Sequence, residues 1–258
     1  MDSWPRHHLR LLLTAVRFYT RLPVPAWVGH SDELMRQSSV YLPVVGGLVG
    51  AVTAGVWWLA ARWWSPAVAA LLSTGAGILL TGAFHEDGLA DVCDGFGGGW
   101  TTERILAIMK DSRVGTYGVL GLGLVLATKV VILQSAGPMV PALLLVAHPL
   151  SRLVAVSFLH THDYARFTPD SKAQAVAQPL ALNNLLMTAV WGLAPLLGLA
   201  VWRHQPGYLL VLGPLALLQL GLGRWFRRWL GGYTGDCLGA AQQLAEVLIY
   251  LLLTAQFA

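Results

Sequence analysis

The fold and the chemistry of this chain depend on the run His85-Glu86-Asp87-Gly88-Leu89-Ala90-Asp91-Val92-Cys93-Asp94-Gly95, which directly follows a long apolar segment. The chain has only 13 acidic residues, and four of them fall in this run. In a helix, Asp87, Asp91 and Asp94 would stand at i, i+4 and i+7, on one narrow stripe. Neighbouring carboxylates repel one another unless a cation lies among them. We expect Mg²⁺, which binds carboxylate oxygens and shares its remaining positions with substrate phosphates.

Two residues beside this stripe are flanking candidates, because Glu86 points away from the stripe and His85 further still. The alternative is that the acidic residues form an ordinary solvated helix face and that Gly97-Gly98-Gly99 is only a loop. Charges are scarce in this chain and are clustered here against apolar runs. The pattern therefore favours a site over a solvated face.

The composition describes a polytopic membrane protein. Of the 258 residues, 55% are hydrophobic and 12% are charged, which is about half the charged fraction of ordinary soluble domains. The pairs Trp57-Trp58 and Trp63-Trp64 fit the aromatic belts of membrane interfaces. We expect an all-α bundle, one domain over residues 1–258, with seven spans at about 43–61, 67–84, 114–133, 140–158, 185–202, 208–222 and 238 to the C-terminus.

The N-terminal region, residues 1–40, is predicted to be interfacial. The short apolar run at 11–16 is broken by Arg17 and Arg21 and lacks the small-residue pattern of a cleavage site. We interpret it as an amphipathic helix on the cytoplasmic membrane surface, and not as a signal peptide.

The basic and small residues inside the spans allow predictions of where their side chains lie and which helices pack together. Lys129 is predicted to lie near the far interface, where its long stem can reach the headgroups. Arg152 is expected to face a cavity or the bundle interior, because a charge facing lipid is costly. Gly46 and Gly50 are expected to let another helix approach the first span closely.

The basic residues predict the orientation. With seven spans and a cytoplasmic N-terminus, thirteen Lys and Arg face the cytoplasm, and only Arg62 and Arg203 face the other side. This positive-inside bias supports both the number of spans and the orientation. The thirteen are Arg6, Arg10, Arg17, Arg21, Arg36, Arg104, Lys110, Arg113, Arg166, Lys172, Arg224, Arg227 and Arg228.

Every motif-like segment, including the predicted active-site segment 85–113, falls on this cytoplasmic face. An enzyme working at the membrane surface needs only such a one-sided arrangement, whereas a transporter places polar groups through the membrane. A nucleic-acid partner is not expected, because the basic residues are scattered among apolar runs. Cys93 and Cys237 fit neither a disulfide framework nor a metal-ligand spacing.

A second polar segment, Lys110-Asp111-Ser112-Arg113, suits phosphoryl transfer. Its two cations and the Ser112 hydroxyl can hold phosphate oxygens, and a metal on the acidic stripe would neutralise the rest of a diphosphate. The alternative is that Lys110 and Arg113 are only the basic flank of the third span.

The motifs also carry a resemblance. The run at 81–95 and the run Ile108-Met109-Lys110-Asp111-Ser112-Arg113-Val114-Gly115-Thr116-Tyr117-Gly118 resemble the signatures of the adenosylcobinamide-GDP ribazoletransferase (cobalamin synthase) family. Weaker matches lie at 17–25, 41–46 and 234–240, with Glu246. The resemblance implies a Mg²⁺-dependent enzyme of the bacterial inner membrane. It would join adenosylcobinamide-GDP to α-ribazole or α-ribazole 5′-phosphate and release GMP.

The resemblance also implies roles for the acidic residues. Asp87, Asp91 and Asp94 would form the metal and diphosphate site. Glu86 and His85 are second choices, as a ligand, a base or an orienting group.

Further residues would contact the substrates. Lys110 and Arg113 would hold phosphate oxygens, and Asp111 would orient one of them or bind a second metal. Asp236 is a further acidic candidate, with a turn or helix-capping role as the alternative. Arg166 is expected either to touch phosphate or to be a solvated interfacial residue.

Two other functions remain alternatives. A membrane phosphotransferase of the CDP-alcohol type also presents spaced aspartates on a cytoplasmic helix end, but its later aspartate pair is not matched here. A corrinoid transporter would need more polar residues within the spans than Lys129 and Arg152 provide. The sequence leaves open whether the chain forms a homo-oligomer and whether free or phosphorylated ribazole is preferred.

Overall fold

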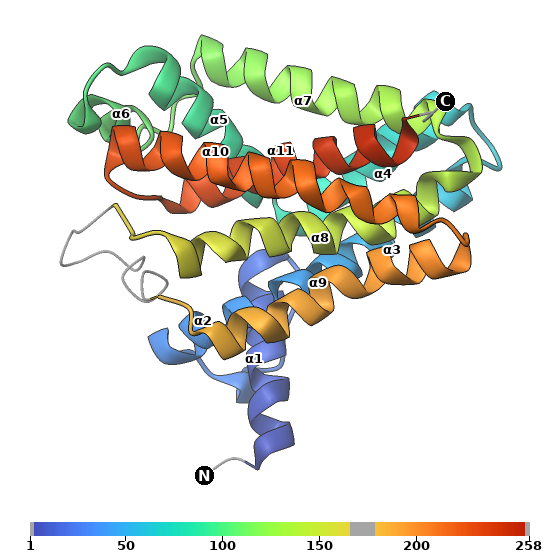
Figure 1. The fold of residues 1–258 in the computed structure, drawn as a ribbon, viewed down its shortest axis with the longest axis horizontal. Coiled ribbons are helices and arrows are strands. Elements are labelled where there is room, and N and C mark those ends of the chain that lie inside the picture. The colour runs from blue at the N-terminus through green and yellow to red at the C-terminus, as the bar shows by residue number, and fades with distance from the viewer. Residues whose placement is uncertain (1–2, 166–178, 256–258) are drawn as a thin grey trace.

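The computed structural model describes residues 3–165 and 179–255, and this part of the chain is helical without β-strands (Figure 1). Short 3-10 turns join several of the helices. The α-helices are α1 (Trp4–Tyr19), α2 (Asp32–Ser38), α3 (Leu42–Ala60), α4 (Pro66–Thr81), α5 (Phe84–Gly98), α6 (Thr102–Ile108), α7 (Thr116–Ser135), α8 (Val140–Thr161), α9 (Leu182–Trp202), α10 (Leu212–Leu230) and α11 (Gly235–Thr254).

The predicted multi-pass bundle is confirmed, with one correction to the second span. Within the described residues, six helical segments are long and apolar enough to cross a membrane. A seventh span is reached only by joining α4 to α5, and these two helices are bent by 92°. The predicted span 67–84 corresponds to α4, whose 16 residues extend about 24 Å, less than the hydrocarbon core of about 30 Å.

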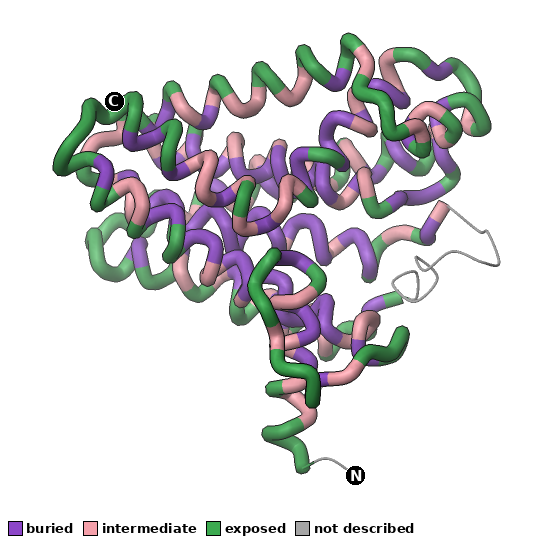
Figure 2. Tube along the Cα trace, turned by 180° about the vertical axis from the view of Figure 1, so that it is seen from behind, coloured by how far each residue is buried: buried purple, intermediate pink, exposed green. Residues whose placement is uncertain are grey.

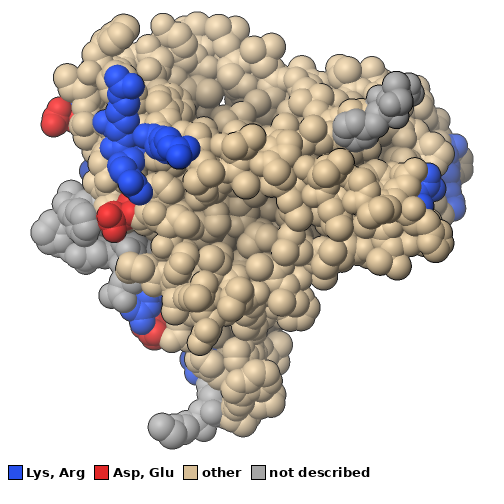
Figure 3. Space-filling view, viewed as in Figure 1, with Lys and Arg blue, Asp and Glu red and all other residues tan. Residues whose placement is uncertain are grey.

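The chain turns gather at two opposite ends of the bundle. In Figure 1 the α3–α4, α7–α8 and α9–α10 turns and the C-terminal end of α11 lie at the right. Helix α6 and the α10–α11 turn lie at the left. On the face shown in Figure 3, charged side chains lie near the ends and along the lower left edge, and a broad uncharged band separates them. This distribution is that of a protein spanning a bilayer.

Helices α3, α8 and α11 are the most buried of the long helices, whereas α7, α9 and α10 are largely exposed. The exposed and half-buried turns of α7 run along the top of Figure 2. Gly46 and Gly50 of α3 lie directly against α8. A Cβ atom built on Gly46 would lie 2.6 Å from the His148 carbonyl oxygen, and one on Gly50 would lie 2.7 Å from that of Leu144. The predicted close approach of another helix to the first span is therefore confirmed.

Helix α1 is amphipathic, as predicted. Leu11, Ala15 and Tyr19 are buried at spacings of four residues, which is one face of a helix. The helix runs across the direction of the long helices, on the lower side of the bundle in Figure 1. After its end, the Arg21 amide donates a 2.7 Å hydrogen bond to the Leu80 carbonyl oxygen. The N-terminal region therefore reaches the junction of α4 and α5.

Candidate active site

The acidic run begins at a sharp break in the backbone. Gly82 and Ala83 both have positive φ, 65° and 59°, which ends α4 and starts α5 in a new direction. Glycine tolerates this conformation, whereas alanine pays roughly 1–2 kcal/mol for it. Because the two helices are bent by 92°, the direction of α5 is not set by α4. It must be set by contacts with the other helices.

Helix α5 contains the whole acidic run, so the predicted helix is confirmed. Asp87 is exposed, Asp91 is half-buried and Asp94 is buried. The opposite face carries apolar residues, including Leu89, Val92 and Phe96, which line a groove formed with α7, α10 and α11. Helix α5 thus has an acidic side and an apolar side, as the stripe requires. In residues 3–165 and 179–255, no three His, Cys, Asp or Glu side chains form a ready-made metal cage.

Asp94 joins the two sequence motifs. One carboxylate oxygen accepts a 2.6 Å hydrogen bond from the Gly115 amide, and the other accepts a 2.8 Å bond from the Gly118 amide. These amides belong to the start of α7, where a helix has unpaired N–H groups and favours a negative charge. Asp94 therefore caps α7 from a neighbouring helix. Its role as a metal ligand stays a prediction.

The second motif lies in the connection between α6 and α7. Lys110, Ser112 and Arg113 are exposed there. The Arg113 guanidinium donates hydrogen bonds to both Asp111 oxygens, at 2.6 Å from Nη2 to Oδ2 and 3.0 Å from Nε to Oδ1. These bonds lower the pKa of Asp111 to about 2 and raise the pKa of Arg113. At neutral pH Asp111 and Arg113 therefore both stay charged. Lys110 is exposed beside this pair.

Asp236 is brought beside the acidic helix. A Cβ atom built on Gly88 of α5 would lie 2.9 Å from the Asp236 carbonyl oxygen and 3.3 Å from the Gly239 Cα. This contact between backbones places the start of α11 against the first half of α5. Thr234 caps α11 by accepting a hydrogen bond from the Cys237 amide. Arg166 lies outside the described residues, and its contact with phosphate stays a prediction.

The two flanking candidates lie inside the bundle. His85 is buried and stacks on Tyr19 at a ring distance of 6.5 Å. Glu86 is 8% exposed, and its Oε1 accepts a 2.8 Å hydrogen bond from the Gln243 amide. Both side chains therefore pack α5 against other helices and do not lie on its exposed face. Their predicted catalytic roles are not tested by this geometry.

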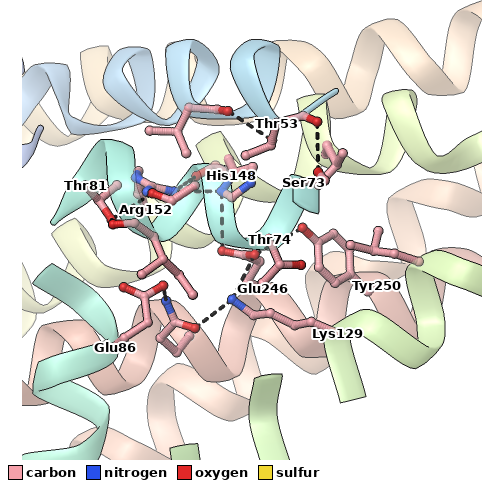
Figure 4. Close-up of a pocket in the computed structure, with 16 residues that line it drawn as sticks. Thr53, Ser73, Thr74, Thr81, Glu86, Lys129, His148, Arg152, Glu246 and Tyr250 are labelled. Carbon is pink, nitrogen blue, oxygen red and sulfur yellow. Dashed lines mark hydrogen bonds and ion pairs between the residues drawn. The ribbon is translucent and has the colours of Figure 1, made fainter. Parts of the chain in front are cut away.

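A buried polar cluster around Glu246 extends to Glu86 at its edge (Figure 4). The prediction that Lys129 lies near an interface is wrong, because Lys129 is buried and its Nζ lies 2.9 Å from the Glu246 Oε1. Glu246 of α11 pairs with the Lys129 ammonium inside the bundle, so the Lys129 side chain does not extend to the headgroups. Arg152 is 2% exposed, which confirms its interior position. Its guanidinium donates to the His148 carbonyl oxygen at 2.9 Å.

The sequence reasoning missed Gln243 and His148 in this cluster. Lys129 and Arg152 were the available signals, since basic residues within apolar spans demand interior partners. The partner could not be read from the sequence, because it depends on how α7, α8 and α11 are aligned along one another.

Comparison with known proteins identifies the family. A family model described as Cobalamin-5-phosphate synthase matches residues 11–254. The adenosylcobinamide-GDP ribazoletransferase of Shewanella frigidimarina is 46% identical over 98% of this chain and 97% of its own length. The chain belongs to the adenosylcobinamide-GDP ribazoletransferase family. The ribazoletransferase of Ralstonia pickettii is 47% identical over 95% of this chain and 94% of its own length. No solved structure matches the chain.

Membership in the ribazoletransferase family confirms the resemblance found in the two motifs. The chain is an enzyme, a transferase of cobalamin biosynthesis with membrane-spanning helices. The CDP-alcohol phosphotransferase and transporter alternatives are set aside by this result.

Proposed function

We propose that this chain joins adenosylcobinamide-GDP to α-ribazole or its 5′-phosphate in a Mg²⁺-dependent reaction that releases GMP. The observation that carries the proposal is the acidic face of α5, which Asp94 ties to the start of α7 just after the segment 110–113. An acidic face next to a basic loop suits a substrate whose reacting group is a diphosphate.

The donor set on α5 is compatible with Mg²⁺. This ion commonly takes one or two carboxylates, several waters and substrate phosphates, so a closed protein cage is unnecessary. Asp87 and Asp91 stand one helical turn apart, and Asp87 is exposed. We assign these two as the ligands and Asp94 as the anchor of the second motif. When bound, the ion would withdraw negative charge from the diphosphate.

The remaining steps fall to the side chains of the 110–113 segment and to the substrates. Lys110 and Arg113 hold non-bridging phosphate oxygens and orient the diphosphate. A ribose hydroxyl forms a bond to the phosphorus nearest the corrinoid, and the bond from that phosphorus to GMP breaks. The hydroxyl proton passes to solvent or to a carboxylate of the acidic face. GMP leaves with the electron pair of the broken bond.

We place this site on the cytoplasmic side of the bacterial inner membrane. In the part of the chain that the structure describes, most of the exposed Lys and Arg belong to α6, the α6–α7 connection and the last turns of α10, near the end of the bundle that carries α6 (Figure 1). The positive-inside rule requires such an excess at a cytoplasmic end. A water-soluble nucleotide-activated substrate would reach Asp87 there without crossing the lipid.

The proposed reaction is tested with the purified full-length protein in liposomes. Adenosylcobinamide-GDP, α-ribazole and Mg²⁺ should together yield GMP and a complete cobamide in equal amounts. Leaving out either organic substrate or adding EDTA should abolish both products. Full turnover in EDTA would refute the Mg²⁺ dependence, and no product under any condition would refute the proposed reaction.

A further inference from the structure

Among the contacts of the first turn of α5, one side-chain hydrogen bond lies deep in the bundle. In the described part of the chain, the only hydrogen bond to the Glu86 carboxylate is the 2.8 Å bond from the Gln243 Nε2. The other carboxylate oxygen is buried without a protein partner there. Since α4 and α5 are bent by 92° at Gly82 and Ala83, the position of the first turn of α5 depends on its contacts with other helices, and this hydrogen bond joins it to α11.

The Gln243 side chain has a single allowed orientation. Its Oε1 accepts a 2.6 Å hydrogen bond from the Lys129 Nζ, and its Nε2 donates to Glu86 and, at 3.0 Å, to the Gln242 Oε1. An ammonium can only donate and a carboxylate can only accept, so turning the amide over would place donor against donor and acceptor against acceptor. Gln243 is also 1% exposed, which leaves water little access.

The anchor of this chain of contacts is Glu246. Its Oε1 accepts the Tyr250 hydroxyl at 3.0 Å and lies 2.9 Å from the Lys129 Nζ, while its Oε2 accepts the Gln242 amide at 2.7 Å. A continuous path therefore runs from Glu246 through Lys129 and Gln243 to Glu86 (Figure 4). Charged groups inside a membrane bundle are costly, so their presence here suggests a role beyond stability.

We propose that Gln243 is a positioning residue of the transferase site. It holds Glu86 and thereby fixes the first turn of α5, which presents Asp87 and Asp91. In this arrangement Glu86 acts as a hydrogen-bond acceptor and touches no substrate. The proposal rests on the function proposed above, because it assigns the reacting groups to the exposed face of α5.

Substitutions at the two partners separate positioning from direct chemistry. Gln243→Leu removes the donor, and Gln243→Glu sets two carboxylates against each other. Both should lower the kcat of GMP release by about 10- to 100-fold, the usual range for groups that orient metal ligands, while the KM for adenosylcobinamide-GDP changes less than about threefold.

Glu86→Gln keeps an acceptor oxygen and should retain most of the activity. The double variant Glu86→Gln with Gln243→Glu exchanges the amide and the carboxylate, so a donor again faces an acceptor. Its activity should exceed that of Gln243→Glu alone by about fivefold or more, as expected for a directly coupled pair, and the recovery is partial because the Gln242 Oε1, which accepts from Gln243 in the wild type, then faces a carboxylate oxygen. The proposal is overturned if Glu86→Gln alone is as inactive as Asp91→Asn, or if the exchange recovers no activity.

Hydrogen–deuterium exchange provides a readout that does not depend on turnover. Gln243→Leu should speed exchange in peptides covering 84–91 and leave those covering α9 unchanged. Thr188→Val is the control, since Thr188 is an equally buried residue of α9 whose hydroxyl donates to the Val40 and Asn184 carbonyl oxygens and not to the Glu86–Gln243–Lys129–Glu246 path. It should lower the melting temperature without speeding exchange at 84–91. Unchanged exchange in Gln243→Leu would overturn the positioning role, even if the wild type released no GMP.

Discussion

Asp94 links the two motifs of the sequence through the backbone. Its carboxylate accepts hydrogen bonds from the Gly115 and Gly118 amides. A Cβ atom on either glycine would collide with a carboxylate oxygen of Asp94. The spacing of three aspartates on one stripe was predictable from the helical repeat. The different uses of Asp94 and Asp87 were not, because they depend on where α7 begins relative to α5.

Asp94→Asn should weaken this junction. The carboxamide has one acceptor oxygen, and its amide group would face a backbone N–H. Losing one hydrogen bond to a charged group costs about 1.5–3 kcal/mol, so we expect a melting temperature lower by roughly 3–12 °C and slower GMP release. Asp32→Asn, at an exposed position of α2, is the control and should change neither quantity. Lost activity with an unchanged melting temperature would show that Asp94 is a ligand and not an anchor.

At the scale of elements, the bend between α4 and α5 is the feature that could not be predicted from the sequence. The apolar run predicted a span at about 67–84, and the spacing of the acidic residues predicted a helix after it. Both helices exist, but the 92° bend depends on positive φ at Gly82 and at Ala83. Alanine carries no sequence signal for such a conformation. The helix contents were therefore predictable and the direction of α5 was not.

Glycine substitutions can test this break. Ala83→Gly should leave the melting temperature unchanged or raise it, because relief of the left-handed conformation offsets the added freedom of the unfolded chain. Ala90→Gly, the same change inside α5, should destabilise the protein by about 1 kcal/mol. Differential scanning fluorimetry of both variants in one detergent gives the comparison. Equal losses in the two variants would argue against the left-handed conformation at Ala83.

At the scale of the whole molecule, the candidate site lies near one end of the bundle, and the α3–α4, α7–α8 and α9–α10 turns lie at the opposite end. The apolar spans other than the second, and the basic bias of the chain, were predictable from the sequence. The interior cluster around Glu246 was not, since it unites α5, α7, α8 and α11 through contacts between residues far apart in sequence.

Labelling from either side of the membrane tests the proposed orientation. In a background with Cys93 and Cys237 replaced, Arg203→Cys should react with an impermeant maleimide added to spheroplasts. Ser112→Cys should react only after the membrane is opened. Both positions are exposed in the structure, so neither reaction is limited by burial. The reverse pattern would place the candidate site outside the cytoplasm.

The most direct measurement of the central claim is the Mg²⁺ dependence of GMP release by the wild type and by Asp91→Asn. The wild type should require Mg²⁺. The variant, inserted normally and melting within a few degrees of the wild type, should be slower by about 100-fold or more and should need more Mg²⁺ for half-maximal rate. Full activity of Asp91→Asn at saturating Mg²⁺ would contradict the assignment of the acidic face of α5 as the metal and diphosphate site.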